Sequence, residues 1–292
     1  MSDEVRWEAP AKINLSLELR PRDDQGLHPL RSLVQAIEWC DILEIAAADE
    51  DSLSISGADL PEGGDNLVWR AIGELRKEIG RDKPPFAITL TKLIPVAAGL
   101  GGGSSDAAAS LMAAGAIMKV SPKALRELAP RVGADVPFFL HGGSLWAEGY
   151  GELLTPARIA PDFAVALAVP DFELSTARVY EAWDSLGSPL GPVVAGRGLP
   201  PGLRSAEPFR NDLVPASLHV RPELGDWISD LSDRWERPVL MSGSGPSLFA
   251  FFTDLEEAED AVQAVPSTAR SAMAALPRSL GASRAGGLEE GT

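Results

Sequence analysis

Hydrophobic and polar residues alternate near the beginning of the chain in the manner of a β-strand. From Ala11 to Leu19, apolar residues hold the odd positions and polar residues, among them Lys12 and Asn14, hold the even ones. Successive side chains of a strand point to opposite faces, so the segment predicts a half-buried strand whose polar face carries Lys12 and Asn14. Short apolar runs predict further strands at 34–37, 42–45, 52–56, 86–90, 164–169, 239–241 and 248–252.

Between these strands, apolar residues recur at the spacing of an α-helix. In the segment 66–79, Leu67, Ala71, Leu75 and Ile79 fall on one helical face. Similar patterns predict helices at 107–120, 124–132, 176–186, 224–235 and 255–265. Strands in groups with helices between them predict an α+β fold with mixed or antiparallel sheets.

The length of 292 residues favours two lobes over one compact domain. We place the boundary near residue 150, with 1–150 as the first lobe and 151–265 as the second. The segment 187–202 is rich in proline and glycine, has no periodicity and predicts a surface loop.

The formal net charge is −16, and such a surface repels both nucleic acid and anionic lipid. We therefore expect no nucleic-acid or membrane partner, and any positive potential for an anionic substrate must be local. The single cysteine, Cys40, excludes an intrachain disulfide, and with three histidines there is little material for a zinc site. The acidic N-terminus is unlike a signal peptide, and no apolar run reaches the roughly 20 residues of a membrane helix. These features predict a cytoplasmic protein. The sequence does not choose between a monomer and a homodimer.

A glycine-rich segment, Pro95 to Asp106, lies between a predicted strand and a predicted helix. Glycines at 99 and 101–103 let the backbone N–H groups approach a phosphate, and the following helix adds positive potential at its N-terminus. Ser104 and Ser105 either cap the helix or offer a hydroxyl to phosphate or Mg²⁺. Gly103 is not followed by lysine, so this is no Walker loop, and the position in mid-chain does not suit a dinucleotide fingerprint. Glycine runs are also common in plain turns, but the flanking strand and helix favour a phosphate site.

Asp135 and Lys12 each admit two interpretations. Asp135 precedes Pro137, where an N-capping residue of a helix commonly stands. Lys12 on an amphipathic strand is by default a solvated charge. The alternative is that Asp135 accepts a proton from a substrate hydroxyl while Lys12 stabilises the transferring phosphoryl group, which is most of what phosphoryl transfer asks of a protein.

Three segments together resemble the GHMP kinase superfamily: Ala9 to Leu15 (APAKINL), Pro95 to Asp106, and Met241 to Ser247 (MSGSGPS). Shorter matches at 65–67, 133–137, 147–149 and 211–213 extend the resemblance to about residue 260. Mevalonate and galactose kinases carry a Gly-Glu-His type sequence after their first strand, and this chain has Ser16-Leu-Glu-Leu19 there. The segment therefore favours the branch of the family that phosphorylates a cytidine-diphosphate-linked polyol.

The resemblance implies a two-lobed fold with the active site in the cleft between the lobes. It implies ATP as phosphoryl donor, Mg²⁺ as cofactor, and the 2-hydroxyl of a cytidine-diphosphate-linked methylerythritol, an isoprenoid precursor, as acceptor. Asp135 is then the catalytic base and Lys12 its charged partner. The implied ATP-binding residues are Asn66, Lys92, Pro95, Gly99, Leu100, Gly101, Gly102, Gly103, Ser104 and Ser105, with Ser105 also a candidate Mg²⁺ ligand. The implied residues for the second substrate are Asn14, His28, Thr176, Tyr180, Gly243, Ser244 and Gly245, with His28 at the cytosine.

Two features depart from the family pattern. Leu27 stands where the family usually has an aromatic residue before the histidine, so either Tyr180 carries more of the stacking on cytosine or the affinity for the substrate is lower. The segment 266–292 lacks the usual final hydrophobic strand, so we expect a weakly packed tail, frayed or helical, and a sheet without its last strand.

Two other functions remain open on the sequence. One is a sibling kinase that acts on another small alcohol, such as homoserine or mevalonate. The other is a sensor that binds nucleotide without catalysis, against which the presence of both Lys12 and Asp135 counts.

Overall fold

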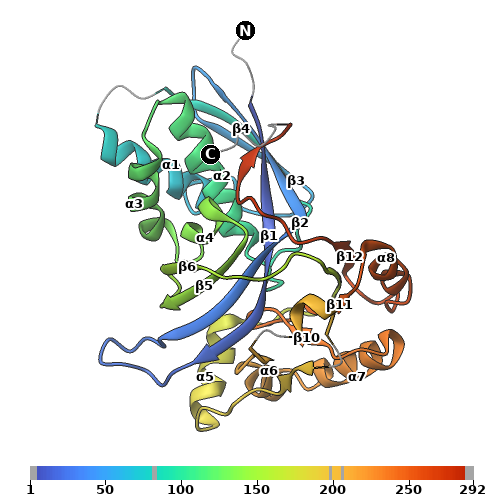
Figure 1. Cartoon of the computed structure of the whole chain (residues 1–292). Coiled ribbons are helices and arrows are strands. Elements are labelled where there is room, and N and C mark those ends of the chain that lie inside the picture. The colour runs from blue at the N-terminus through green and yellow to red at the C-terminus, as the bar shows by residue number, and fades with distance from the viewer. Residues whose placement is uncertain (1–4, 81–83, 197–198, 205–206, 287–292) are drawn as a thin grey trace.

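The computed structural model describes residues 5–80, 84–196, 199–204 and 207–286, and within them it has two main β-sheets, each with its own helices, and a third sheet of two short strands (Figure 1). The first sheet has the strand order β13-β1-β2-β4-β3, with β5 on β2 and β6 on β5. Its strands are β1 (Val5–Leu19), β2 (Leu30–Ala47), β3 (Ser52–Ser56), β4 (Phe86–Thr91), β5 (Ser144–Gly149), β6 (Leu153–Pro156) and β13 (Ser283–Arg284). All pairs are antiparallel except β3 with β4, which is parallel.

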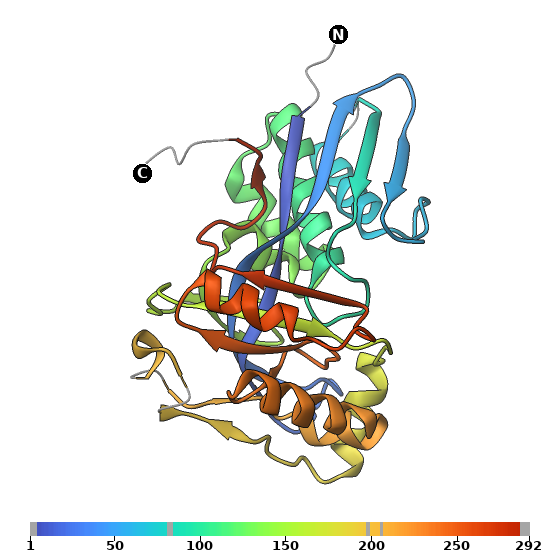
Figure 2. The ribbon, with the colours of Figure 1, turned by 90° about the vertical axis from the view of Figure 1, so that its right-hand side faces the viewer.

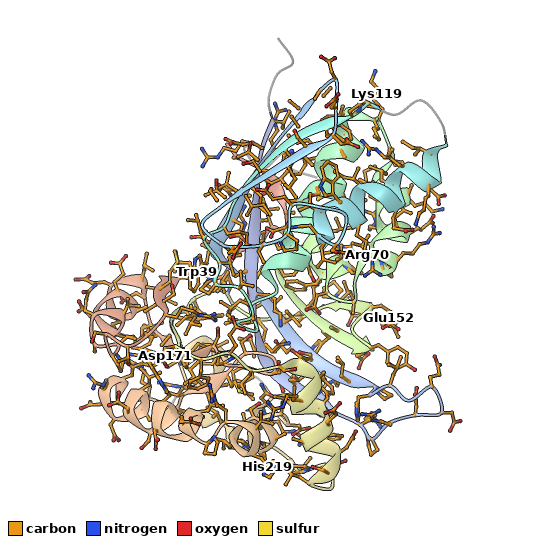
Figure 3. The ribbon with its side chains drawn as sticks, turned by 180° about the vertical axis from the view of Figure 1, so that it is seen from behind. Trp39, Arg70, Lys119, Glu152, Asp171 and His219 are labelled. Carbon is orange, nitrogen blue, oxygen red and sulfur yellow. The ribbon has the colours of Figure 1, made fainter. Side chains whose placement is uncertain are left out.

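Four helices pack on this sheet and bury its main core. They are α1 (Leu67–Ile79), α2 (Gly102–Ile117), α3 (Pro122–Val132) and α4 (Val136–His141). Helix α2 lies innermost, and ten of its residues are buried because alanine dominates its sequence. Lys119, which follows α2, lies at the top of the first lobe in Figure 3, so the N-terminal end of α2 points toward the second lobe.

The second sheet has the antiparallel order β10-β11-β7-β12. Its strands are β7 (Ala164–Val169), β10 (Leu240–Met241), β11 (Leu248–Phe252) and β12 (Ser271–Ala275). The helices of this lobe are α5 (Thr176–Ser185), α6 (Val214–Val220), α7 (Glu223–Trp235) and α8 (Leu255–Gln263), and Figure 2 shows α8 lying against the sheet. A two-stranded antiparallel sheet of β8 (Val193–Val194) and β9 (Phe209–Arg210), with a 3₁₀ turn (Pro201–Leu203) between them in the sequence, completes this lobe. The predicted α+β class with mixed and antiparallel sheets is confirmed.

Strand β1 connects the two lobes, and this corrects one prediction. We expected a half-buried strand, but Lys12 and Asn14 on its polar face are each only 7% exposed. The reason is that β1 and β2 run out of the first lobe into the second (Figure 1). The register of β1 against β2 shifts between Asn14 and Ser16, so Leu17 lines the same pocket as Lys12 and Asn14. Leu17 and Leu19 belong to the core of the second lobe, which therefore covers the face that carries Lys12 and Asn14.

The boundaries of two other elements also differ from the prediction. The strands expected at 34–37 and 42–45 are one strand, β2, whose register against β1 shifts between Pro10 and Ala11. Helix α2 begins at Gly102, five residues before the predicted start at Ala107. Its first turn is made of glycine and serine, which carry no apolar periodicity, so the pattern alone does not show where the helix begins.

The prediction of a weakly packed tail without a last strand is wrong for the residues that the structure describes. Strand β12 pairs with β7 over Ser271–Ala275 and supplies the edge of the second sheet, and β13 pairs with β1. Backbone hydrogen bonds hold these strands, so small side chains suffice; Arg278 adds an ion pair with Glu8 at 2.7 Å. Residues 287–292 lie outside the described part. The lobe boundary near residue 150 stays a prediction, although the β5–β6 hairpin that spans it belongs to the first sheet.

Candidate active site

The glycine-rich segment forms one wall of a cleft of about 580 Å³. Nearly every residue expected at the nucleotide lines this cleft. They are Asn66, Lys92, Pro95, Gly99, Leu100, Gly101, Gly102, Gly103 and Ser104. Ser105 does not line it. Asn66 also caps α1, because its side-chain oxygen accepts from Val68 N at 2.9 Å.

Two glycines of the loop have a structural reason to be glycine. Gly99 has a φ of +79°, and a Cβ there would lie 2.5 Å from Ser242 O. Gly101 has a φ of +73°, and its Cβ would lie 2.7 Å from the ring of Phe139. Any side chain at either position would therefore be strained and would force apart the segments that meet at the loop. Ala97 has a φ of +52° without being glycine, so the loop also carries some backbone strain.

The N-terminus of α2 carries no side-chain cap. Gly101 is the N-cap residue, so neither Ser104 nor Ser105 caps the helix, and the capping interpretation of the two serines is wrong. The first N–H groups of a helix have no partner within it, and the helix dipole is positive at this end. An uncapped N-terminus beside a cleft is suited to bind phosphate.

Beside the cleft lies a smaller polar pocket of about 190 Å³. It is lined by Lys12, Asn14, Leu17, Leu30, Gly99, Gly101, Asp135, Thr176, Tyr180, Leu213, Gly243 and Ser244. Gly99, Gly101 and Thr176 line both cavities, so the two meet at the glycine loop. The structure thus brings Lys12 and Asp135 into one pocket at the edge of the nucleotide cleft, although they are far apart in the sequence.

Asp135 stands directly before α4 but does not cap it. The side chain makes no capping hydrogen bond, and the residue is exposed. The capping interpretation of Asp135 is therefore wrong, and its carboxylate is available to a ligand in the pocket. A carboxylate without a structural task at the mouth of a polar pocket is a candidate general base.

Lys12 is buried and in contact with a neutral group. Its Nζ donates to Asn14 Oδ1 at 2.6 Å. Burial lowers the pKa of Lys12 from its ordinary value, and the negative charge of Asp135 offsets this in part. The interpretation of Lys12 as a solvated charge is wrong, because the residue is 7% exposed.

Lys92 behaves differently from what we expected of a nucleotide ligand. Its Nζ forms ion pairs with Asp41 and with Asp106, the latter at 2.6 Å, and its side chain is 3% exposed. Asp41 also accepts from the backbone N of Leu93 and Ile94. The ammonium of Lys92 thus joins β2 to the first turns of α2, the helix that carries the glycine loop.

The charges of this cluster are coupled. Burial and the negative charge of Asp41 raise the pKa of Asp106 to about 8, against the attraction of Lys92. For Lys92 burial acts against the charged form, but the two carboxylates outweigh it and raise the pKa. With Asp106 protonated, Lys92 and Asp41 balance each other's charge, which is the least costly state in a buried site.

The residues expected at the second substrate divide into two groups. Asn14, Thr176, Tyr180, Gly243 and Ser244 line the small pocket. His28 and Gly245 do not.

The ring of His28 is packed behind Tyr180, with 5.4 Å between the ring centroids. Its Nδ1 lies 3.0 Å from Arg20 O, and its Nε2 lies 3.3 Å from Asp184. The buried Nε2 makes no hydrogen bond among the described residues, although Asp184 is near it. Leu27 is 49% exposed.

Three residues of the site carried no assigned role in the sequence analysis. Asp41 is a lone acid between two apolar runs, which is a weak signal of a buried charge. Asp106 ended the glycine segment without a function. Asn211 lay in the matched segment 211–213, and it holds the backbone of the 241–243 segment through its side chain.

The described residues contain no group of three or more histidine, cysteine, aspartate or glutamate residues placed to hold a metal ion. Over the same residues, no helix is both long enough and apolar enough to cross a membrane.

Comparison with known families and proteins agrees with this geometry. The profile for the N-terminal domain of GHMP kinases matches residues 66–143, and the profile for the C-terminal domain matches residues 219–271. Among curated proteins, the 4-diphosphocytidyl-2-C-methyl-D-erythritol kinase of Pelotomaculum thermopropionicum is 40% identical over 258 residues, which cover 86% of this chain and 90% of that protein. The enzyme of the same name from Geobacter sulfurreducens is 38% identical over 277 residues, which cover 93% and 98%.

Solved structures show the same relationship. A crystal structure of 4-(cytidine 5'-diphospho)-2C-methyl-D-erythritol kinase superposes with a TM-score of 0.75 at 32% identity, covering 93% of this chain and 98% of that one. A homoserine kinase from Cytophaga hutchinsonii superposes with a TM-score of 0.72 at 19% identity, covering 97% and 98%. At that identity the second match shows the shared fold alone.

Proposed function

The chain belongs to the GHMP kinase family, among the 4-diphosphocytidyl-2-C-methyl-D-erythritol kinases, and on that premise we propose that it phosphorylates 4-diphosphocytidyl-2-C-methyl-D-erythritol with ATP. The acceptor is the 2-hydroxyl of the methylerythritol moiety, and the reaction serves the non-mevalonate route to isoprenoid precursors. The observation that carries this proposal is the junction of the two cavities. Lys12 and Asp135 line a polar pocket that meets the nucleotide cleft at Gly99 and Gly101.

The reaction forms one oxygen–phosphorus bond and breaks another. The acceptor oxygen attacks the γ-phosphorus of ATP, the bond to the β-phosphate oxygen breaks, and ADP leaves. Asp135 takes the proton of the acceptor hydroxyl. Lys12 stabilises the negative charge on the attacking oxygen and the transferring group, and Asn14 orients its ammonium.

The nucleotide is held mainly by backbone groups. The loop from Gly99 to Ser104 and the uncapped N-terminus of α2 face the cleft, and they offer N–H donors to the phosphates. This arrangement suits a protein of net charge −16, because local dipoles attract the anion that the overall field repels. Lys92 supports the loop from behind through Asp41 and Asp106.

Mg²⁺ belongs to the proposal because the loop has oxygen atoms to spare. Ser105 Oγ and Asp106 Oδ1 are buried and have no hydrogen-bond partner among the described residues. Of the two, Ser105 Oγ is the protein oxygen that would join the shell of an ion carried mainly by the ATP phosphates, because Asp106 keeps its proton and already accepts from Lys92. The bound ion would neutralise charge on the transferring phosphoryl group.

Recognition of the cytidine side rests on Tyr180. Its ring lines the small pocket together with Leu17 and Leu30, and it packs on His28. Burial raises the pKa of Tyr180 to about 12, so the ring stays neutral at physiological pH. With Leu27 in place of an aromatic residue, we assign the stacking contact with cytosine to Tyr180. We further propose that the protein is cytoplasmic, that it is a monomer or a homodimer, and that it has no nucleic-acid or membrane partner.

An assay with purified protein tests the function. ATP consumption is measured with 4-diphosphocytidyl-2-C-methyl-D-erythritol, with homoserine and with mevalonate, at equal concentrations. We expect turnover with the cytidyl substrate alone, and a phosphorylated product confirmed by mass. Turnover with homoserine or mevalonate instead would make the protein a sibling kinase, and ATP binding without any phosphorylated product would make it a sensor.

A further inference from the structure

The segment Asn211–Leu213 lies between β9 and α6, next to the small pocket. Leu213 lines this pocket, and Asn211 does not. The Asn211 side chain is 6% exposed, and its Nδ2 donates to Met241 O and to Gly243 O, each at 2.8 Å. Its Oδ1 accepts from Leu213 N at 2.9 Å. These partners fix the orientation of the amide, because the reversed amide would place its oxygen against two carbonyl oxygens.

The same segment is anchored to β1, the strand that carries Lys12 and Asn14. Asn211 forms an isolated parallel bridge with Leu17, and Asp212 N donates to Leu17 O at 2.9 Å. The buried carboxylate of Asp212 accepts from Leu19 N at 3.0 Å. Asn211 is therefore held at a fixed place relative to the strand of the candidate catalytic lysine.

The other end of the connection is the 242–247 loop, which forms a wall of the small pocket. Ser242 Oγ accepts from Asn14 N at 3.3 Å and donates to Gly99 O at 3.0 Å. Ser244 Oγ lies 2.9 Å from Thr176 Oγ1. The loop thus touches β1, the glycine loop and α5, and Gly243 and Ser244 face the pocket beside Lys12 and Asn14.

We propose that Asn211 is a positioning residue for the second substrate. Its amide holds the carbonyl groups of Met241 and Gly243 and so sets Gly243 and Ser244 at the correct distance from Lys12 and Asn14. The acceptor hydroxyl is then aligned between the glycine loop and Asp135. The identity of that substrate rests on the proposed function, but the coupling between Asn211 and the 242–247 loop does not.

Two variants separate positioning from plain structural support. Asn211→Asp is nearly isosteric and keeps the acceptor for Leu213 N, but it removes both N–H donors and turns a carboxylate toward two carbonyl oxygens. Asp212→Asn is the matched control. It removes the charge that pairs with Arg210 Nε at 3.2 Å and one of the two acceptors for Leu19 N and Gly191 N, but it keeps the backbone contacts with Leu17 that place Asn211 and does not touch the 242–247 loop.

The kinetic readout is the KM for the cytidyl substrate, kcat and the dissociation constant of ATP, measured for the full chain. For Asn211→Asp we expect KM for the cytidyl substrate to rise, or kcat to fall, by about tenfold or more, because a small displacement of a positioned group is costly. The dissociation constant of ATP should change by no more than about threefold, since only transition-state and second-substrate contacts are lost. Asp212→Asn should lower the melting temperature with both kinetic constants nearly unchanged.

The proposal would be overturned if Asn211→Asp weakened ATP binding as much as it raised KM for the cytidyl substrate. It would also be overturned if Asn211→Asp and Asp212→Asn changed KM and kcat equally. If Asn211→Asp does not fold, Asn211→Ala is judged by the same criteria. If the wild type does not turn over the cytidyl substrate, the proposed function fails, and amide hydrogen exchange still tests the inference. The amides of Ser242 and Gly245 donate to Ser247 O and Ser242 O. Faster exchange of these two in Asn211→Asp, but not in Asp212→Asn, supports the coupling, and unchanged exchange refutes it.

Discussion

Two buried lysines lie on either side of the glycine loop, and their surroundings differ. A Cβ on Gly101 would lie 3.1 Å from the Lys12 side chain, and a Cβ on Gly102 would lie 3.2 Å from Lys92 Nζ. Lys12 contacts an amide and faces a pocket, and burial lowers its pKa. Lys92 is held by two carboxylates, which raise its pKa. Both lysines are buried, and they differ in the number of buried carboxylates around the ammonium. Lys12 has none in contact among the described residues and is free for chemistry, whereas Lys92 has two and supports the fold.

The largest effect on the Lys12 side of this comparison is expected from Asp135→Asn. Asparagine cannot take the acceptor proton, so kcat should fall by about 10²–10⁴, which is ~3–5 kcal/mol of barrier. The dissociation constant of ATP should change little, because Asp135 does not line the nucleotide cleft. Steady-state kinetics and equilibrium dialysis measure the two quantities. A variant that retains half of the activity would remove Asp135 from the chemistry.

On the Lys92 side the main effect is on stability. Lys92→Met leaves Asp41 and Asp106 buried without their common partner, and breaking such a cluster costs about 3–5 kcal/mol of unfolding free energy. Urea denaturation measures the loss.

The matched control is the triple variant in which Asp41 and Asp106 are also replaced by asparagine. It carries no buried charge and should recover most of the stability. Its affinity for ATP then shows whether Lys92 supports the loop or binds the nucleotide. Recovery of stability without recovery of ATP binding would contradict the supporting role.

The unfolding free energy should depend on pH through Asp106 of the Lys92 cluster. The folded-state pKa of Asp106, about 8, is above the ordinary value of 3.8, so the folded protein keeps a proton that the unfolded chain releases. The contribution of neutral Asp106 to stability is therefore fully present below 3.8 and is lost as the pH rises to about 8. Asp106→Asn should flatten this part of the unfolding free energy when it is plotted against pH. An unchanged slope would show that Asp106 is ionised in the folded state.

The smallest effect concerns Cys40, where the same physics acts on a group that we assign no function. Burial raises the pKa of Cys40 to about 11. Since the thiolate is the reactive form, labelling near neutral pH should be roughly a hundred times slower than for a free cysteine. Reaction with a chromogenic thiol reagent, with and without denaturant, gives the ratio. Labelling at the rate of a free cysteine would show that burial does not raise the pKa of the Cys40 thiol.

The sequence was sufficient to predict most of the fold because periodicity reports which residues are buried. The helices α1, α5 and α7 and the strands β7 and β11 lie within one residue of their predicted positions or closer. The start of α2 escaped prediction because glycine and serine carry no periodic signal. The tail escaped it because β12 is held by backbone hydrogen bonds, which the side-chain pattern does not report.

The candidate site divides in the same way. Local motifs identified the glycine loop, Lys12 and Asp135, and these line two cavities that meet. The role of Lys92 was not predictable, because Asp41 lies 51 positions away and the ion pair forms only when β2, β4 and α2 assemble. Nor did the sequence show that the polar face of β1 is buried, since the second lobe that covers it comes from distant segments.

The different roles of the two lysines are tested most directly by measuring kcat and the unfolding free energy of Lys12→Met and of Lys92→Met. We predict that Lys12→Met lowers kcat by about 10²–10³ through the loss of a transition-state charge. Its unfolding free energy should stay unchanged or rise, because the buried ammonium is disfavoured there. Lys92→Met should show the converse, a large loss of stability with turnover by the folded fraction far less affected. If Lys12→Met destabilises the protein while its folded fraction keeps full turnover, the assignment of the two lysines is contradicted.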